Sequence, residues 1–151
     1  MNEMITEISA IIDSPPSRVY NILADYREGH PAILPKKYFS EIVLLEGGKG
    51  SGTIFESQLN FMGIRQKYHV EVSEPDPGHI LVETDEITGG VVTFIVKSFE
   101  GGSKSHLTIS MQNKVSPGIK GYIEKLLNPY LNRRIFTEEI GLLRAYLQDK
   151  R

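Results

Sequence analysis

Between residues 38 and 114 the sequence alternates apolar and polar residues in six successive stretches, and no helical periodicity interrupts them. The expected strands are Tyr38–Glu46, Ser51–Phe61, Ile64–Ser73, His79–Asp85, Val91–Phe99 and Lys104–Lys114. The gaps between them are rich in glycine and other turn-forming residues, and they are too short for the crossovers that parallel strands need. Successive strands are therefore expected to pair antiparallel in one sheet.

The first part of the chain predicts one more strand and two short helices. Met4–Ile12 alternates and adds a seventh strand. A helix is expected next, with Asp13 or Ser14 as its cap and a proline in its first turn. Its apolar residues lie at helical spacing: Val19, Ile22, Leu23 and Tyr26. His30–Leu34 is expected to form one further helical turn.

A long helix is expected over Gly118–Gln148, the only extended stretch with helical periodicity. Its apolar stripe consists of Ile119, Ile123, Leu126, Tyr130, Ile140, Leu143 and Leu147. Its polar face consists of Lys120, Glu124, Lys125, Asn132 and Glu139. Pro129 predicts a kinked helix, or two helices with Asn128 as the cap of the second. Lys150 and Arg151 suit the negative end of the helix dipole.

The strands have one apolar face and one solvated face, which is typical of a single sheet that needs one cover. The face that is expected to point inward contains Thr53, Phe55, Ser57, Leu59, Phe61, Ile64, Gln66, Tyr68, Val70, Val72, Leu107, Ile109 and Met111. The long helix is the only candidate for the cover. The expected fold is therefore α+β, a curved seven-stranded antiparallel sheet wrapped around the C-terminal helix, with an apolar cavity between them.

Composition limits the protein class. A chain of 151 residues is long enough for one domain, expected to span residues 1–151, with a substantial core. The net charge of −2 gives no electrostatic case for nucleic acid or an anionic membrane. Without cysteine there are no disulfides or thiolate metal sites. Neither a signal peptide nor a membrane-spanning run is found, so a cytoplasmic, soluble protein with no integral membrane association is expected.

Several motifs, taken in order, resemble the START-like (SRPBCC) superfamily, the helix-grip fold that includes the polyketide cyclase/dehydrase family. They are the helix entry "SPPSRVYNIL" with Asp25 after it, the hairpin "EGGKGSGT", the stretch "EPDPGHILVE" and the proline-interrupted "LLNPYLNRR". The resemblance covers nearly the whole chain. Many members carry tryptophan where Tyr20 stands, and this chain has none. The resemblance implies a deep apolar pocket that takes lipids, sterols, quinones, polyketides or plant metabolites.

The candidate pocket residues combine aromatic side chains with a few polar ones, as a small-molecule site requires. They are Tyr20, Phe55, Ser57, Leu59, Phe61, Gln66, Tyr68, Phe94, Met111, Ile123, Tyr130, Arg133 and Arg134. The alternative is an ordinary packed core. An inward arginine at position 133 or 134 would need an acidic partner such as a ligand carboxylate or enolate; the sequence leaves open which arginine faces inward.

Other polar motifs favour no further chemistry. The four histidines lack metal-ligand spacing, so no metal and no cofactor are expected. His30 is placed in a loop at the pocket mouth, and the acidic group Glu83, Asp85 and Glu86 is expected to be solvated. "GGKGSG" joins two strands and does not match a phosphate-binding loop.

Three functions remain open from the sequence. The first is binding of a hydrophobic or amphipathic small molecule, such as a lipid, quinone or polyketide. The second is a cyclase or dehydratase in which Tyr20, Tyr68 or His30 moves protons. The third is a protein-interaction module, which predicts an exposed apolar patch. The sequence does not indicate the oligomeric state.

Overall fold

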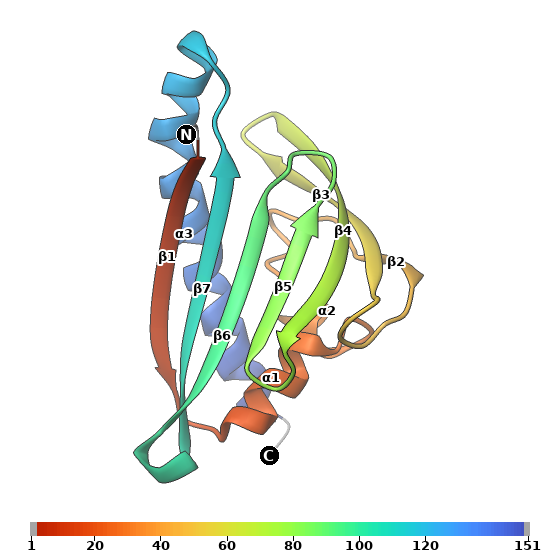
Figure 1. Ribbon diagram of the computed structural model, residues 1–151, viewed down its shortest axis with the longest axis vertical. Coiled ribbons are helices and arrows are strands. Elements are labelled where there is room, and N and C mark those ends of the chain that lie inside the picture. Colours follow the sequence, from red (N-terminus) through yellow and green to blue (C-terminus); the bar gives the residue numbers. More distant parts are fainter. Residues whose placement is uncertain (1–2, 150–151) are drawn as a thin grey trace.

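The computed structural model describes residues 3–149 and contains one seven-stranded antiparallel sheet, two short helices and one long helix (Figure 1). The elements are β1 (Glu3–Ile12), α1 (Pro16–Ala24), α2 (Gly29–Ile33), β2 (Val43–Glu46), β3 (Ile54–Phe61), β4 (Ile64–Asp76), β5 (Ile80–Asp85), β6 (Val91–Phe99), β7 (Lys104–Lys114) and α3 (Gly118–Asp149), and one 3₁₀ turn, η1 (Glu100–Gly102), joins β6 to β7. The strand order is β1-β7-β6-β5-β4-β3-β2. The expected α+β helix-grip fold is confirmed.

The predicted strand bounds agree with the observed ones to different degrees. β6 and β7 have the predicted bounds, and β4 continues three residues further, to Asp76. The prediction for Tyr38–Glu46 is wrong over its first half, because the backbone amides of Tyr38 and Phe39 both bond to the carbonyl of Pro35 and form a turn. Only Val43–Glu46 pairs with β3 over an extended stretch.

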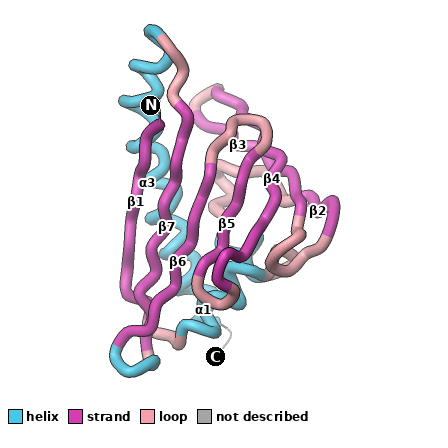
Figure 2. The backbone as a smooth tube through the Cα atoms, viewed as in Figure 1, coloured by secondary structure: helices cyan, strands magenta, loops and turns pink. Residues whose placement is uncertain are grey.

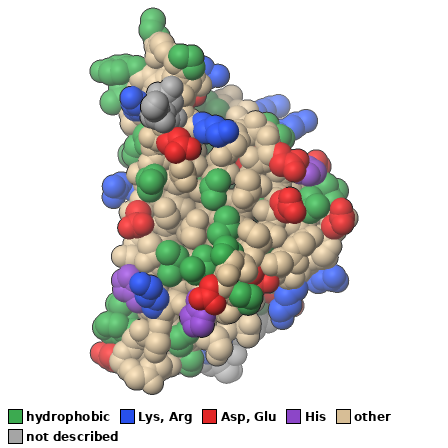
Figure 3. Space-filling model, viewed as in Figure 1, with side chains coloured by type: hydrophobic (Ala, Val, Ile, Leu, Met, Phe, Trp, Pro, Cys, Tyr) green, Lys and Arg blue, Asp and Glu red, His purple; other side chains and the backbone are tan. Residues whose placement is uncertain are grey.

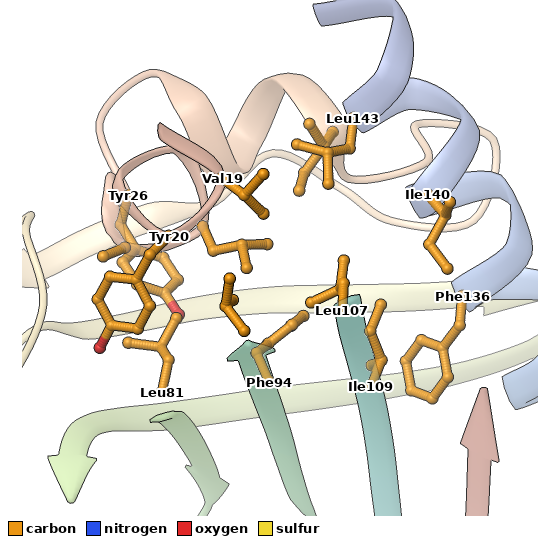
Figure 4. Packing of buried hydrophobic residues seen from close by; sticks show 14 of the residues in the cluster. Val19, Tyr20, Tyr26, Leu81, Phe94, Leu107, Ile109, Phe136, Ile140 and Leu143 are labelled. Atoms are coloured by element: carbon orange, nitrogen blue, oxygen red, sulfur yellow. The ribbon is translucent and has the colours of Figure 1, made fainter. Parts of the chain in front are cut away.

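The helices lie on one side of the sheet, with α3 running along β1 and β7 and α1 and α2 beside its C-terminal half (Figure 2). The core forms where these elements meet (Figure 4). Val19 of α1, Leu107 of β7 and Leu143 of α3 are all fully buried there. Within the described residues no helix has the length and apolar character needed to cross a membrane.

α3 is one continuous helix that includes Pro129, so the expectation of two separate helices is wrong. Its C-terminal half buries its apolar residues, including Ile140 and Leu147, against the core. Its N-terminal half does the opposite. Ile119 is 81% exposed and Leu126 is 62% exposed, although both were predicted to face the sheet.

Two residues of α3 that were assigned to its polar face also have to be reassigned. Glu139 is only 4% exposed and belongs to the buried face. Glu124 is half-buried, and its carboxylate accepts hydrogen bonds from the backbone amide and the hydroxyl of Ser116. The predicted dipole partners Lys150 and Arg151 lie outside the described residues.

The caps of the short helices differ from the prediction. The cap position of α1 is Pro15, with no side-chain hydrogen bond, so neither Asp13 nor Ser14 caps it. Asp25 instead stabilises the start of α2, because its carboxylate accepts hydrogen bonds from the backbone amides of residues 27, 28 and 29. The turn between α1 and α2 also fixes the position of His30.

The glycine-rich hairpin before β3 packs against the end of α1. The amide of Gly50 donates to the carbonyl of Ala24, and the amide of Ser51 donates to the Glu74 carboxylate. A side chain at position 50 would collide with Glu74, and the φ of Gly50 is +60°. These backbone donors are already used within the protein, so the loop has a packing role.

Candidate functional site

A cavity of about 160 Å³ lies between the sheet, α3 and the loop that precedes β2. Its walls are mostly apolar and come from elements that are distant in sequence: Leu34, Phe39, Ile42, Phe55, Leu59, Tyr68, Val70, Val92, Phe94, Met111, Leu131, Ile135 and Phe136. The alternation of β3, β4, β6 and β7 directs these side chains to the same face of the sheet. The space is therefore a product of the sheet's curvature and of α3 above it.

One end of the cavity carries a buried polar cluster. The hydroxyl of Tyr26 donates a 2.6 Å hydrogen bond to Oε2 of Glu83. Nε2 of His30 lies 3.4 Å from the same carboxylate oxygen. The His30 ring also stacks on Tyr26 at 4.6 Å and meets Phe94 edge-on. A histidine, a tyrosine and a carboxylate from three segments thus converge on one oxygen.

A hydrogen bond fixes the orientation of the His30 ring. Nδ1 is 2.7 Å from the carbonyl oxygen of Leu23, which can only accept, so Nδ1 carries a hydrogen. The other nitrogen, Nε2, faces Glu83 at 3.4 Å. An imidazole nitrogen and a carboxylate are therefore held next to each other at the cavity wall.

A second carboxyl, Glu139 of α3, also lines the cavity. It is 4% exposed, and its Oε1 has no hydrogen-bond partner among the described residues. Burial, and then the nearby charge of Glu83, raise the pKa of Glu139 well above its ordinary value. Burial therefore favours the neutral carboxylic acid form of Glu139, which has hydrogen-bonding capacity toward the cavity.

Two expectations about polar residues are corrected by this geometry. His30 does not lie in a mouth loop, because it is in α2 and only 2% exposed. Glu83 and Asp85 are not solvated, because both point to the inner face of β5 as Leu81 does. Asp85 closes the turn after β5 by accepting from the backbone amides of His69 and Thr88. Glu86 is exposed, as expected.

The rest of the polar lining carries no charge. Asn132 donates its side-chain amide to Asn113, which links α3 to β7 at the cavity rim. Ser57 and Asn128 also line the space. The Tyr68 hydroxyl makes no hydrogen bond to a described residue, and burial raises its pKa to about 12. Tyr68 is therefore a protonated donor.

A cluster of hydrogen bonds fastens the loop before β2 to α3. Nε of Arg134 donates to the Tyr38 hydroxyl at 2.8 Å, and that hydroxyl donates to Glu138 at 2.7 Å. Lys37 pairs with the other oxygen of Glu138 at 2.8 Å. The same loop supplies Leu34, Phe39 and Ile42 to the cavity wall. The cluster therefore holds one wall of the cavity closed.

The predicted pocket residues divide into two groups. Those that line the cavity are Phe55, Ser57, Leu59, Tyr68, Phe94 and Met111. Those that lie outside it are Tyr20, Phe61, Gln66, Ile123, Tyr130, Arg133 and Arg134.

The residues outside the cavity have other partners or face solvent. Tyr20 is buried, but its hydroxyl donates to Glu74 at 2.6 Å. Phe61 contacts the ring of Tyr38, and Gln66 donates to the backbone of Lys67. Ile123, Tyr130 and Arg133 are exposed on α3. Arg134 is exposed as well and is held by Tyr38 and Tyr130.

Sequence reasoning did not bring together the residues of the polar end: Tyr26, His30, Glu83 and Glu139. A signal existed for two of them. Glu83 has the same parity along β5 as the apolar Leu81, and Glu139 lies one turn from both Ile135 and Leu143 on the buried face of α3. The helical spacing that placed Tyr26 with Val19 and Leu23 indicated its burial but not its partner, because α1 ends at Ala24. For His30 we find no comparable signal.

The electrostatic character of the site follows from its lining. Among the described residues that line the cavity there is no lysine or arginine, whereas Glu83, Asp85 and Glu139 are acidic. An anionic group would therefore meet no cation inside and would lose its hydration. No group of three or more histidine, aspartate or glutamate side chains within residues 3–149 is arranged to hold a metal ion.

No protein-family model matches the sequence, and no curated protein matches it either. Several solved structures are similar to this chain. The NMR structure of KanY protein is 26% identical, covers 98% of this chain and 99% of its own, and has a TM-score of 0.84.

Two further structures are similar at 14% identity. The aromatase/cyclase ZhuI from a Streptomyces species covers 97% of this chain and 94% of its own, with a TM-score of 0.77. A START superfamily protein from Mycobacterium smegmatis covers 97% and 99%, with a TM-score of 0.72. Together with the seven-stranded sheet closed by α3, these likenesses show that the chain has the helix-grip fold of START-like (SRPBCC) proteins.

Proposed function

We propose that the protein binds a hydrophobic or amphipathic small molecule that is electrically neutral, with an apolar ring or chain in the cavity and an oxygen or nitrogen at its polar end. The observation that carries this proposal is the buried carboxyl oxygen Oε1 of Glu139, which has no hydrogen-bond partner among the described residues, in a mostly apolar cavity. A buried polar atom without a partner costs about 1–3 kcal/mol. A ligand that accepts a hydrogen bond from Glu139 removes this cost.

The volume limits the size of the buried group. An engineered apolar cavity of about 150 Å³ in another protein binds benzene, and the cavity here measures about 160 Å³. One six-membered ring or a short branched chain therefore fits inside. A larger ligand requires one wall to move, and the loop held by Tyr38 is the part that we expect it to displace.

The charge of the lining determines which ligands are disfavoured. The sequence suggested that Arg133 or Arg134 would hold a carboxylate or an enolate, but neither lines the cavity. Fatty acids and other carboxylates would bring a negative charge toward Glu83 without a compensating cation. Neutral quinones, ketones, phenols and alcohols keep their hydrogen bonds without that cost.

A matched pair of dyes tests both the site and the charge preference. N-phenyl-1-naphthylamine and 8-anilino-1-naphthalenesulfonate share one aromatic framework, and only the second carries an anionic sulfonate. We expect the neutral dye to bind with enhanced fluorescence and at least about tenfold more tightly than the anionic dye, because tenfold corresponds to only about 1.4 kcal/mol of desolvation.

Two serine variants locate the dye. Ser57 lines the cavity, so Ser57→Phe fills part of it and is expected to abolish binding of the neutral dye. Ser98 is exposed near the end of β6, so Ser98→Phe adds the same side chain elsewhere and leaves binding unchanged. Equal binding by both variants would place the dye outside the cavity and refute the proposal.

A specific observation also favours a second candidate function, proton transfer of the cyclase or dehydratase type. Glu139, whose pKa burial raises, lines the cavity together with His30 and Glu83, whose Nε2 and Oε2 atoms lie 3.4 Å apart. Titratable groups with different environments in one site are typical of general acid–base catalysis. In this reaction Glu139 donates its proton to a ketone oxygen while Nε2 of His30, whose Nδ1 hydrogen is held by the Leu23 carbonyl, accepts a proton from the adjacent carbon, which yields the enol.

Hydrogen–deuterium exchange of 2-indanone tests this activity. We expect the protein to accelerate exchange at the carbons next to the carbonyl in heavy water, as followed by NMR, and Glu139→Gln to remove the acceleration. Tyr20→Phe is the control, because Tyr20 bonds to Glu74 away from the cavity. Exchange at the uncatalysed rate would leave binding as the function and reject catalysis.

A further inference from the structure

The N-terminal half of α3 carries an apolar surface that the fold does not cover. Six large side chains are between 45% and 81% exposed there: Ile119, Tyr122, Ile123, Leu126, Leu127 and Tyr130. At these fractions each exposes on the order of 100 Å², so the surface reaches or exceeds the roughly 300–600 Å² of the largest apolar patch on a typical monomer. We call this surface the outer stripe.

The outer stripe is a consequence of helix geometry. Ile119, Ile123, Leu126 and Tyr130 follow one another at intervals of four, three and four residues, which places them on one side of a helix. The opposite side carries Gly121, which is buried so tightly that a Cβ would lie 1.7 Å from the carbonyl oxygen of Ser116. This half of α3 therefore packs through its small and polar side and presents its apolar side outward.

Cations border the outer stripe. The net charge of the whole chain is −2, yet residues 114–134 contain five basic side chains and a single acidic one. The basic ones are Lys114, Lys120, Lys125, Arg133 and Arg134. The acidic one, Glu124, already binds the backbone amide and hydroxyl of Ser116. Lys120 and Lys125 are exposed and lie within one helical turn of Ile123 and Tyr122, respectively.

Another apolar tip lies at the same end of the molecule. The antiparallel order brings the turn between β3 and β4 and the start of α3 to one end of the sheet (Figure 1). Met62, at the tip of that turn, is 87% exposed, and Ile64 beside it is also exposed. Arg65 and Lys67 follow on β4 and are exposed too. Figure 3 shows hydrophobic side chains projecting at the end where α3 begins, with basic side chains near them.

We propose that the outer stripe docks on an anionic lipid surface, with α3 lying in the headgroup region and its apolar side toward the acyl chains. Helices that lie on membranes have this composition, with leucine, isoleucine and aromatic residues on one side and lysine or arginine along its borders. Basic side chains near an anionic leaflet add attraction. The inference does not depend on occupancy of the cavity, and it goes beyond ligand binding.

The charge distribution favours a lipid surface over a second copy of the chain. A two-fold pairing brings the same surface of each copy together. The basic border of the outer stripe would then meet an identical basic border, and Glu124, the one acidic residue in this segment, is already bonded to Ser116. Like charges that face each other oppose association, whereas phosphatidylglycerol or phosphatidylserine complements the cations.

Vesicle sedimentation tests this proposal. Wild-type protein is mixed with vesicles of phosphatidylcholine alone, or with vesicles in which about a third of the lipid is phosphatidylglycerol, at about 0.1 M salt. We expect binding to the anionic vesicles and little to the neutral ones. Ile123→Gln/Leu126→Gln is expected to weaken binding by about tenfold or more, since two buried apolar side chains are lost. Leu142→Gln, at an exposed leucine in the other half of α3, should leave it unchanged.

A second pair of variants isolates the electrostatic part. Lys120→Gln/Lys125→Gln should weaken binding to anionic vesicles by about 25-fold, because each cation near the surface contributes about fivefold. Lys97→Gln, at an exposed position of β6 far along the strand, is the control. Absence of wild-type binding, or equal losses in the controls, would overturn the proposal. So would a dimer by light scattering that Ile123→Gln/Leu126→Gln dissociates while vesicles stay unbound.

Discussion

The two halves of α3 have the same apolar spacing and opposite surroundings. Ile119, Ile123, Leu126 and Tyr130 in the first half repeat at intervals of four, three and four, and so do Phe136, Ile140, Leu143 and Leu147 in the second. The first set is exposed and the second is buried. Identical amphipathic patterns in one helix therefore have different roles, and the reason lies in how the two sets are joined.

The step from Tyr130 to Phe136 is six residues, whereas seven would keep both sets on one side of the helix. A helix turns roughly 100° per residue, so the missing residue rotates the second set around the axis by about that angle. A single straight helix cannot bury both sets against one surface. The sheet covers the second set with α1 and α2, and the first set is left outside.

The largest predicted difference between the halves concerns stability. Leu143 is 1% exposed, so Leu143→Ala is expected to lower the free energy of unfolding by about 2–5 kcal/mol. Leu126→Ala should change it by no more than about 0.5 kcal/mol, since Leu126 is 62% exposed. Urea unfolding followed by circular dichroism measures both. Similar costs for the two variants would show that the first half of α3 is also buried.

Substitutions at two glycines, one in each half of α3, are expected to change stability by smaller amounts and in opposite directions. A Cβ on Gly121 would overlap the Ser116 carbonyl, so Gly121→Ala should destabilise the protein by about 1–3 kcal/mol. A Cβ on Gly141, in the second half, would meet no neighbouring atom within 4 Å, and Gly141→Ala should stabilise by about 0.5–1 kcal/mol. Thermal melts distinguish the two signs. Stabilisation by Gly121→Ala would mean that α3 does not pack closely on the residues before it.

The third prediction concerns Glu139, whose pKa is raised in the folded protein. The unfolded chain ionises this carboxyl above its ordinary pKa of about 4.3 while the folded chain keeps its proton. Its contribution to stability is therefore fully present below that value and is lost as the pH rises toward the folded pKa. Glu139→Gln removes this dependence. As the pH rises, the free energy of unfolding of the variant therefore increases relative to that of wild type, by at most about 1.4 kcal/mol per pH unit.

Urea unfolding at about pH 5 and about pH 8 measures this gain. Glu138→Gln is the neighbouring control, because salt-bridging to Lys37 lowers the pKa of Glu138 and gives the opposite sign. A difference between Glu139→Gln and wild type that stays constant with pH would show that Glu139 is ionised in the folded state.

The sequence predicted most of the fold because its signals are local. Turn residues set the ends of β6 and β7, and alternation placed Phe55, Leu59 and Met111 on the inner face. The same alternation would have placed Glu83 inward, beside Leu81, but its acidic neighbours suggested a solvated cluster. The six-residue spacing between Tyr130 and Phe136 is also visible in the sequence. Nothing in the sequence alone, however, indicates which of the two apolar sets of α3 packs against the sheet.

The polar end of the cavity required the three-dimensional structure. The four residues Tyr26, His30, Glu83 and Glu139 come from the turn after α1, from α2, from β5 and from α3, and their approach depends on contacts between distant segments. His30 acquires its orientation from a hydrogen bond to Leu23 and from ring contacts with Tyr26 and Phe94, which no periodicity reveals. Arg134 could face either way from its position in the helix, and hydrogen bonds to the hydroxyls of Tyr38 and Tyr130 decide it.

One measurement tests the central claim that the ligand site lies in the cavity under α3 and not on the exposed apolar surface of the protein. Met111 lines the cavity and Met62 lies exposed at the β3–β4 turn, so ¹³C-methyl labelling of methionine places one reporter at each location. Titration with N-phenyl-1-naphthylamine is predicted to shift the Met111 methyl signal and leave that of Met62 in place. An unchanged Met111 signal at saturating dye, or a shift confined to Met62, would contradict the account.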